Sequence, residues 1–287
     1  MSSGAWQNII MRRAPTTPYE WNTSAYHLSV PIRSLFGRGV TEGASTPFTK
    51  TMILPTSLRT STEGFFPEMY MSLGHYLASG SNFLIHGAVT KSLTLSCDGG
   101  SLKSSAQFLG RTFAIDGTIT AAGLTIGNYE PLLWRNAVVD LDDTSGNNRA
   151  LDCKGFSLTI DSGCTPVFGN GAILPYKILA GKYAITGSLT LPYEAKTYDS
   201  GSRPWRDFVA SDAGTTSVLK PSRTLRIYWG TATATAVGQL GIQVEVLFGR
   251  PTASAEDETM SDLPFTAYAT PSAEAISVYL ADGVETV

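Results

Sequence analysis

Short runs of alternating apolar and polar residues, each closed by a turn sequence, constrain the fold of this chain more than any other feature. The run Ser-Leu-Thr-Leu-Ser-Cys at 92–97 is followed by Asp-Gly-Gly at 98–100, and another run begins at 102–108. A period of two places apolar side chains on one face of a β-strand, and an Asp-Gly turn joins neighbouring strands. Residues 92–108 are therefore predicted to form a β-hairpin.

The same pattern recurs through the rest of the chain. Five further runs carry it, at 156–160, 183–191, 225–229, 242–248 and 276–280. These runs are rich in Thr, Val, Ile and Tyr, which half-buried strands favour. The predicted fold class is therefore all-β.

Helix patterns are few. Pro67 followed by apolar residues at spacings of three and four predicts a helix over 66–77, and 205–209 is a shorter candidate. Together with the strands, these patterns predict β-sandwich or barrel domains with one small helix each.

Internal repetition suggests how the chain is divided. A chain of 287 residues is longer than a single core of about 100–200 residues usually serves. Five short matches recur in the same order in both halves, and the longest pairs 155–163 with 275–283. Ordered matches predict two tandem copies of one β-fold. The predicted division is an arm at 1–39, a first β-domain at 40–163 and a second at 164–287.

Residues 1–39 differ in composition from the rest. Pro15, Pro18 and Pro31 lie among several tryptophans and tyrosines. Proline disfavours helices and central strands, whereas exposed aromatic side chains favour burial. The segment is predicted to be an extended arm that lies across another surface, and a disordered leader is the alternative.

The charge content separates broad function classes. Apolar residues make up 43% of the chain and charged residues 16%, with a net charge of −3. Such a composition is typical of a packed globular protein and excludes a disordered or nucleic-acid-coating chain. DNA binding needs clustered cations to neutralise phosphates, but only Arg12 and Arg13 are adjacent. The neutral Ser, Thr, Gly and Ala that remain for the surface suit contact with other subunits.

The C-terminal end is acidic. No Lys or Arg follows Arg250, so this end carries −7 and, with a total of −3, the rest of the chain carries +4. A solvated acidic surface, an end-to-end electrostatic match between subunits and an acid-lined channel are the three interpretations. The acidic residues are Glu256, Asp257, Glu258, Asp262, Glu274, Asp282 and Glu285.

No pattern of residues predicts a catalytic, cofactor or metal site. The three histidines have no carboxylate or cysteine at ligand spacing, and the three cysteines form no Cys-x-x-Cys pair. The cysteines are predicted to be small buried side chains, and the protein is predicted not to be an enzyme. The residues concerned are His27, His75, His86, Cys97, Cys153 and Cys164.

Two loops resemble ligand sites only superficially. The acidic stretch that begins at Asp140 lacks the bidentate Glu at position twelve of a calcium loop and has Gly at position seven instead of six. It is predicted to be a solvated hairpin loop. Gly169-Asn170-Gly171 has no phosphate-binding helix after it and is predicted to be a turn.

The chain carries no membrane or export pattern. No window approaches the roughly 18 apolar residues of a membrane span, and the start Met-Ser-Ser-Gly-Ala-Trp lacks the layout of a secretion signal. The sequence therefore predicts no membrane partner and synthesis in a cytoplasm.

Residues 154–193 resemble the central signature of phage tail tube proteins. A strand and turn at 154–163 and a proline-containing loop at 166–169 precede Gly-Lys-Tyr-Ala-Ile-Thr-Gly-Ser-Leu-Thr-Leu at 181–191. That last segment is similar to the family pattern of Gly, a basic residue and a hydrophobic residue followed by a Thr-Gly-Ser-Leu-Thr-Leu strand. Residues 37–43 resemble the opening of the family sequence, and 263–267 with 276–280 resemble its closing strands.

The resemblance implies the tail tube (major tail) protein of a long-tailed, siphovirus-like bacteriophage. It implies tail-tube-type β-sandwich or barrel domains that join into rings and stack into a tube in the virion, after synthesis in the host bacterial cytoplasm. The lumen would hold the tape-measure protein and later DNA, without sequence-specific binding. Since single-domain relatives form six-fold rings, a two-copy chain is expected to close as a homotrimer with pseudo-sixfold symmetry.

Two other interpretations remain open. One is a secreted or surface β-sandwich module that binds carbohydrate or mediates adhesion. Such modules gather aromatic side chains on one face, but here the tryptophans are dispersed along the sequence. The other is a different virion component, such as a tail terminator or a decoration protein.

Overall fold

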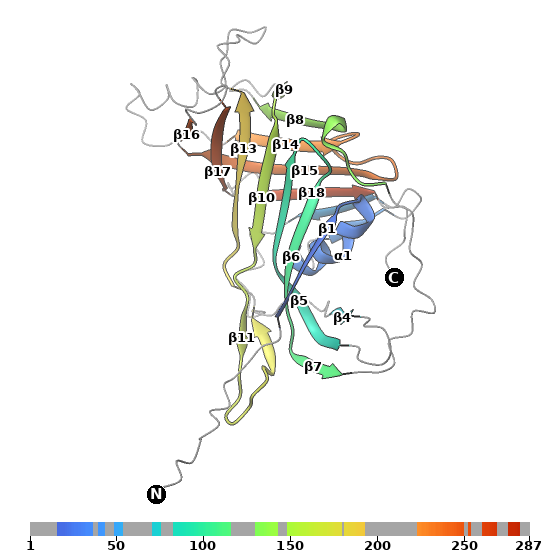
Figure 1. Ribbon diagram of the computed structural model, residues 1–287, viewed down its shortest axis with the longest axis vertical. Helices are drawn as coiled ribbons and strands as arrows, with labels where there is room; N and C mark the ends of the chain where they lie inside the picture. The colour runs from blue at the N-terminus through green and yellow to red at the C-terminus, as the bar shows by residue number, and fades with distance from the viewer. Residues whose placement is uncertain are drawn as a thin grey trace, which may run out of the picture.

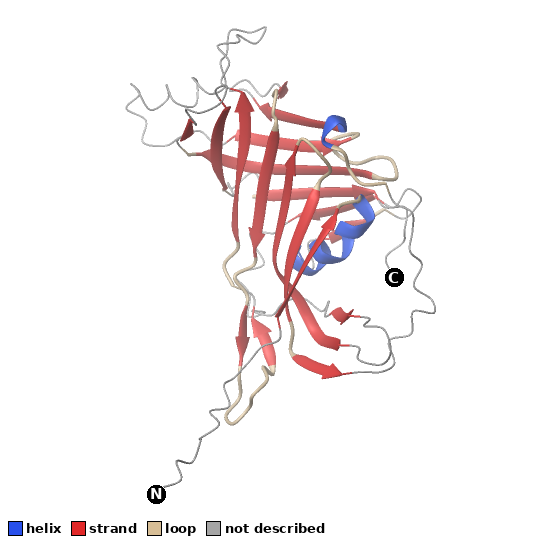
Figure 2. Cartoon of the chain, viewed as in Figure 1, coloured by secondary structure: helices blue, strands red, loops and turns tan. Residues whose placement is uncertain are grey.

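The computed structural model describes residues 16–36, 40–43, 49–53, 71–75, 83–115, 130–142, 148–179, 181–192, 223–249, 252–253, 260–268 and 275–281. β-Strands dominate these residues, as Figure 2 shows. The predicted all-β class is confirmed.

The described strands include all of those predicted from alternation, including the hairpin at 92–108. In chain order they are β1 (Thr16–Asn22), β2 (Val40–Glu42), β3 (Thr49–Ile53), β4 (Met71–His75), β5 (Phe83–Asp98), β6 (Lys103–Leu109), β7 (Thr112–Ile115), β8 (Ala137–Asp142), β9 (Asn148–Ala150), β10 (Gly155–Asp161), β11 (Thr165–Val167), β12 (Lys177–Leu179), β13 (Ala184–Pro192), β14 (Arg223–Trp229), β15 (Gln239–Phe248), β16 (Thr252–Ala253), β17 (Met260–Ala267) and β18 (Ile276–Ala281). An α-helix, α1 (Ala25–Phe36), and a 3-10 helix, η3 (Trp134–Asn136), accompany them.

One antiparallel sheet runs in the order β1-β6-β5-β10-β13-β17-β15-β14-β8-β9, and it divides at β15. β17 pairs with the end of β15 at 246–248, whereas β18 pairs with the same edge at 239–244. β18 then pairs with β3, and β3 with β2. In Figure 1 the strands β5, β6, β10 and β13 run across β14, β15 and β18, so the sheet forms two crossed layers.

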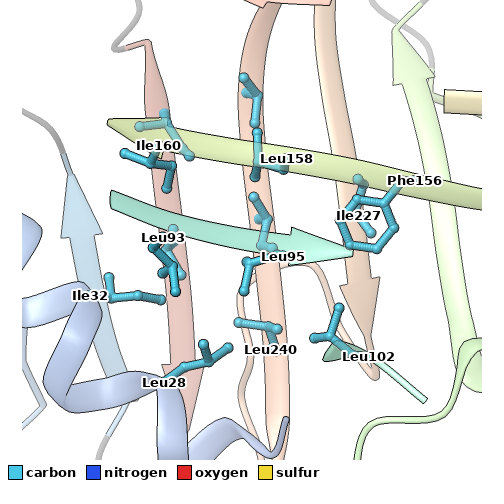
Figure 3. Close-up of a cluster of buried hydrophobic side chains, with 14 of the residues drawn as sticks. Leu28, Ile32, Leu93, Leu95, Leu102, Phe156, Leu158, Ile160, Ile227 and Leu240 are labelled. Atoms are coloured by element: carbon cyan, nitrogen blue, oxygen red, sulfur yellow. The ribbon is translucent and has the colours of Figure 1, made fainter. Parts of the chain in front are cut away.

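The core fills the space between the crossed layers. Leu158 of β10 and Leu95 of β5 point inward from one layer, and Ile227 of β14 points inward from the other (Figure 3). Each is almost completely buried. Orthogonal packing of two sheets brings the apolar faces of both sets of strands together in this way.

Helix α1 closes one side of the core and corrects the predicted arm. Leu28, Ile32 and Leu35 are fully buried, and the helix packs against β3, β5 and β18. The spacing of these residues places them on one face, and burying that face outweighs the helix-breaking effect of Pro31. The extended-arm prediction is therefore wrong for 25–36, and residues 1–15 lie outside the described part.

Strand β1 is extended, as predicted, but it belongs to the sheet. It pairs with β6 along its length, and among the described strands it has no second neighbour. Pro18 lies within β1, which is possible because an edge strand can lack one ladder donor.

The predicted helix at 66–77 is wrong where it can be compared. Residues 71–75 form β4, which pairs with the first half of β5. The ladder with β5 provides hydrogen-bond partners for the backbone N–H and C=O groups of this segment, which an isolated helix would have to pair within itself. The rest of this segment, and the candidate helix at 205–209, lie outside the described residues.

Strands from both predicted halves pair with one another. β10 pairs with β13, β8 with β14, and β3 with β18. The pairing of corresponding strands also differs between the halves. β10 pairs with β5 in the first half, whereas its sequence counterpart β18 pairs with β15 and not with β14, the strand that corresponds to β5. The division into 40–163 and 164–287 stays a prediction, and it would require two copies that exchange strands.

Candidate assembly surfaces

The outer surface of the β5-β10-β13-β17 layer follows from the same alternation that builds the core. Along β10, Phe156, Leu158 and Ile160 are buried, so Ser157 and Thr159 point away from the core. The neighbouring strands alternate in phase with β10 because their registers match inward residues with inward residues. Polar residues of several strands therefore share one outer surface.

Short hydroxyl side chains form rows across this surface. Thr159 lies opposite Thr94 of β5 and Thr186 of β13, and the Oγ1 atoms of Thr94 and Thr159 are 3.0 Å apart. We call the surface the hydroxyl face. Its members are Thr94, Ser96, Ser105, Ser157, Thr159, Thr186, Ser188 and Thr266.

Charged residues lie around the hydroxyl face. Glu20 is opposite Ser105 on the edge strand β1, and Asp262 of β17 accepts a hydrogen bond of 2.9 Å from Thr190. Asp98 and Asp161 lie at the two ends of the central strands, and Lys103 is opposite Ser96. The centre of the face is therefore neutral and its margin is weakly acidic.

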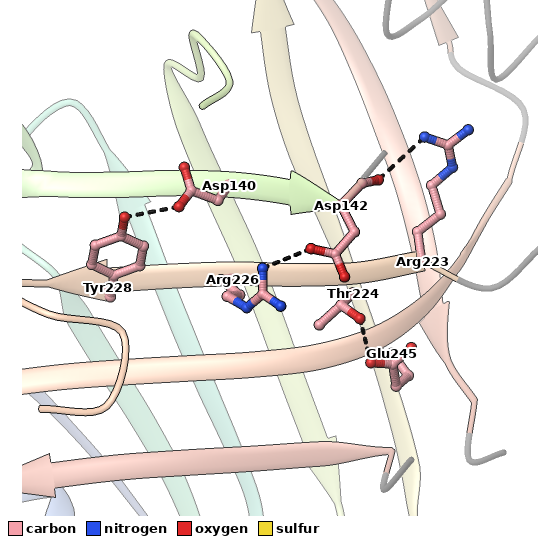
Figure 4. Close-up of polar contacts among 7 residues, drawn as sticks. All are labelled: Asp140, Asp142, Arg223, Thr224, Arg226, Tyr228 and Glu245. Atoms are coloured by element: carbon pink, nitrogen blue, oxygen red, sulfur yellow. Dashed lines mark hydrogen bonds and ion pairs between the residues drawn. The ribbon is translucent and has the colours of Figure 1, made fainter. Parts of the chain in front are cut away.

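The crossed layer presents a different surface, on which carboxylates are paired with hydrogen-bond donors (Figure 4). The Tyr228 hydroxyl donates to Asp140 Oδ2 at 2.8 Å, and Arg226 Nη1 pairs with Asp142 Oδ1 at 2.7 Å. Thr224 donates to Glu245 Oε1 at 2.6 Å. The carboxylates are thus held by donors from β14.

The prediction of a solvated acidic loop is wrong for the first residues of that stretch. Asp140 and Asp142 belong to β8, and Asp140 is only 8% exposed. Their partners come from residues more than 80 positions later, so no local pattern reveals them. Residues 143–147 lie outside the described part.

We expect Tyr228→Phe to lower the free energy of unfolding by about 1–3 kcal/mol, because the buried Asp140 carboxylate loses a donor. Burial, and then Asp140, raise the pKa of Tyr228 above its ordinary 10.0. The folded state therefore prefers the neutral phenol, and this contribution should be lost as pH rises above about 10. Urea denaturation at pH 7 and at pH 10–11 measures both effects. Tyr176→Phe, at an exposed tyrosine, is the matched control, and equal stability of the two variants would contradict the proposed role of the hydrogen bond.

The histidines lie on three different elements. His27 is on α1, where its Nδ1 is 3.0 Å from Ser24 Oγ, while His75 is on β4 and His86 on β5. Among the described residues no group of three side chains could hold a metal ion.

The three cysteines are free thiols, and the predicted burial is confirmed for two of them. Cys97 and Cys164 are buried and Cys153 is half-buried. Burial raises the pKa of Cys153 to about 11, because it disfavours the thiolate. The low thiolate fraction at neutral pH makes Cys153 a poor nucleophile.

The remaining sequence predictions have mixed outcomes. Gly169-Asn170-Gly171 lies in a turn, as predicted, with Gly171 at φ 74°. Of the acidic C-terminal residues only Asp262 lies in the described part. The tryptophans are less dispersed than the sequence suggested, because Trp134 and Trp229 both pack against Phe156. These rings fill the core and form no surface platform for sugars.

The strand predicted at 183–191 lies inside the sheet, because β13 pairs on both sides, with β10 and β17. The free edges lie elsewhere. Within the described part of the chain, β1 pairs with β6 alone and β9 with β8 alone. Both are therefore edge strands among the described residues, and an edge strand can pair with a strand of another chain.

The family model described as phage tail tube protein matches residues 16–267. This chain belongs to that family. The match includes all strands from β1 to β17, so the resemblance carried by residues 154–193 is confirmed. No curated protein matches the sequence. As a phage tail tube protein, the chain has a structural role in the virion, in an assembly built from copies of itself. Among the described residues, no helix has both the length and the apolar character needed to cross a membrane.

Proposed function

We propose that the chain closes into rings that stack into the tail tube of a siphovirus-like phage, and that the hydroxyl face lines the lumen. The observation that carries this proposal is the row of uncharged hydroxyls that crosses adjacent strands, with Thr159 at its centre. This surface is continuous across adjacent strands, and its members are uncharged. The tape-measure protein would occupy the lumen first, and DNA would pass through it later.

The charge of the hydroxyl face suits the passage of DNA. Binding to DNA is driven largely by cations that replace its counterions, and the centre of this face offers none. Asp98, Asp161 and Asp262 at its margin would repel phosphates weakly. DNA would therefore move along the face without being held. In this arrangement the lumen has a neutral wall with an acidic rim, to which Asp262 is the described contributor from the acidic C-terminal residues.

Ring closure would use the free strand edges. An unpaired edge is a hazard for uncontrolled aggregation, and a closed ring removes that hazard by pairing every edge. The edge strands β1 and β9 supply such edges at the two ends of the strand order. Three chains per ring are expected if the two halves are copies, and six if they are not. The rotational symmetry in electron micrographs of purified rings distinguishes these cases.

The introduction of charge on the hydroxyl face tests the lumen assignment. We expect the double variant Thr159→Lys/Thr186→Lys to form tubes but to slow DNA release, with plaque counts reduced about tenfold or more, because each added cation allows counterion release from DNA. Thr159→Asp/Thr186→Asp is the control, since it adds charge at the same positions without attracting phosphate. Tubes are examined by negative-stain microscopy, and DNA release by fluorescence of an intercalating dye.

The outcomes separate the parts of the proposal. If the lysine and aspartate variants release DNA equally, the hydroxyl face does not line the lumen. If the unsubstituted chain forms neither rings nor tubes under any condition of salt and concentration, the ring proposal itself fails.

A further inference from the structure

The hairpin β11–β12 projects away from the crossed layers (Figure 1). The loop between its strands carries apolar side chains that are exposed to solvent. Ile173 is 48% exposed, Leu174 39% and Tyr176 49%. We call these three residues the hairpin tip. A cluster of apolar residues on a projecting element is unusual for a surface exposed to water, and such clusters often mark contact sites.

The hairpin is held in its projecting position. Ile178 of β12 is fully buried and packs with Val89 and Leu109 of the main sheet. The Tyr176 N–H donates to the Val167 carbonyl at 3.0 Å, and Pro175 is buried. The base of the hairpin is therefore anchored, while its tip stands clear.

A hollow of about 330 Å³ lies between the start of α1, the segment before η3 and the β14–β15 turn. Its size falls in the range of roughly 300–1,000 Å³ that is typical of binding pockets. Ala25, Leu132 and Trp229 contribute apolar lining, and the 56%-exposed Val237 lies at its surface. Glu130 supplies a negative charge.

The hairpin tip and the hollow lie at opposite ends of β10. Gly155, at the start of β10, pairs with Asp98 beside the β5–β6 turn, and that turn holds η3 through a hydrogen bond from Trp134 N to Gly100 O. Asp161, at the other end, leads directly to β11. Seven residues of strand, on the order of 20 Å, therefore separate the two features. The tip of one chain lies far from its own hollow.

We propose that the hairpin tip inserts into the hollow of a second copy of this chain, in the next ring of the tube. Two different surfaces then meet in each contact, and a head-to-tail contact that does not close on itself propagates as an open filament. Charge supports the pairing, because Lys177 beside Tyr176 is cationic and the hollow carries Glu130. The inference rests on the proposed function and assigns the contact that stacks the rings.

Cross-linking tests the contact directly. Leu174→Cys and Val237→Cys variants are purified separately, mixed before assembly and treated with a short bis-maleimide. We expect a covalent dimer in tubes made from the mixture and none in tubes made from either variant alone. The native thiols should give little background, because Cys97 and Cys164 are buried and the pKa of Cys153 is about 11.

A control variant places the cysteine at Tyr268, which is 52% exposed on another part of the molecule. Equal cross-linking of Leu174→Cys to Tyr268→Cys, a dimer of Leu174→Cys alone, or no cross-link in well-formed tubes would each overturn the inference. Only the absence of tubes from the unsubstituted chain would point to failure of the proposed function.

An assembly measurement gives a second, independent test. We expect Leu174→Asp to form rings but to raise the concentration needed for tubes about tenfold or more, since insertion would remove an aspartate carboxylate from water and place it in a hollow that already carries Glu130. Phe113→Asp, at an exposed aromatic residue of β7, is the control and should assemble normally. Loss of rings as well as tubes in Leu174→Asp, or normal tubes, would contradict a contact between rings.

Discussion

Trp229→Ala is expected to lower the free energy of unfolding by about 3–5 kcal/mol, a large part of the stability of most domains. The side chain is only 3% exposed, and its ring packs edge-to-face against Trp134 at 6.5 Å. Its Nε1–H also donates to the Leu133 carbonyl at 2.9 Å. Alanine would leave a cavity between the crossed layers and remove the donor to that carbonyl.

Trp229→Phe separates these two contributions. Phenylalanine fills most of the space but cannot donate a hydrogen bond, so we expect an intermediate loss of stability. Urea denaturation followed by circular dichroism measures both variants. An alanine variant within about 1 kcal/mol of the parent would show that the aromatic cluster is not a principal part of the core.

Gly187→Ala should have the second large effect, with a loss of about 1–3 kcal/mol or more from overpacking. A Cβ atom at this position would lie 2.3 Å from both the Phe265 ring and the Ser157 carbonyl oxygen. The carbonyl belongs to the backbone of β10 and cannot rotate away. Gly187 is also the glycine of the Thr-Gly-Ser-Leu-Thr-Leu strand, and the position of Phe265 gives a physical reason for a glycine there.

Gly100→Ala is the matched control. Apart from its two chain neighbours, no residue has an atom within 4 Å of the position that a Cβ at Gly100 would occupy, so this change should be nearly neutral. The melting temperatures of the two variants, compared with that of the parent, test this prediction. If Gly187→Ala melts at the parent temperature, then β13 and β17 have room to separate, and the tight packing of Phe265 on Gly187 does not limit stability.

The strands could be predicted from the sequence because each one carries its own signal. In β10, Phe156, Leu158 and Ile160 alternate with polar residues, and the burial of those three side chains follows directly. Alternation of this kind is a property of a single strand, so it can be recognised without knowing which strands pair with it. The same holds for the glycine turn at 169–171.

Features that depend on distant partners could not be predicted. Helix α1 contains Pro31, and only the packing of Leu28 and Ile32 against other strands makes the helix favourable. Asp140 resembled part of a solvated loop because Tyr228 is 88 residues away. The polar positions of the hydroxyl face could be predicted along each strand separately. The rows that these positions form depend on the register between strands such as β10 and β13.

The hairpin tip and the hollow were missed for a related reason. Ile173 and Leu174 resemble core residues in the sequence, but both side chains are exposed in the structure. The hollow combines residues from three separate segments, which no local pattern connects. Apolar residues next to a glycine-rich turn were the available signal, and they would have indicated an exposed tip.

The division of the sheet at β15 has a mechanical consequence for a tail. β17 and β18 meet the same edge of β15 on either side of Glu245, so both crossed layers share one continuous strand. A load on one layer reaches the other through the covalent backbone of β15. The layers cannot slide past one another without breaking the backbone hydrogen bonds that this strand makes with its neighbours. A tube built from such subunits would respond to bending at the contacts between rings, while each subunit kept its shape.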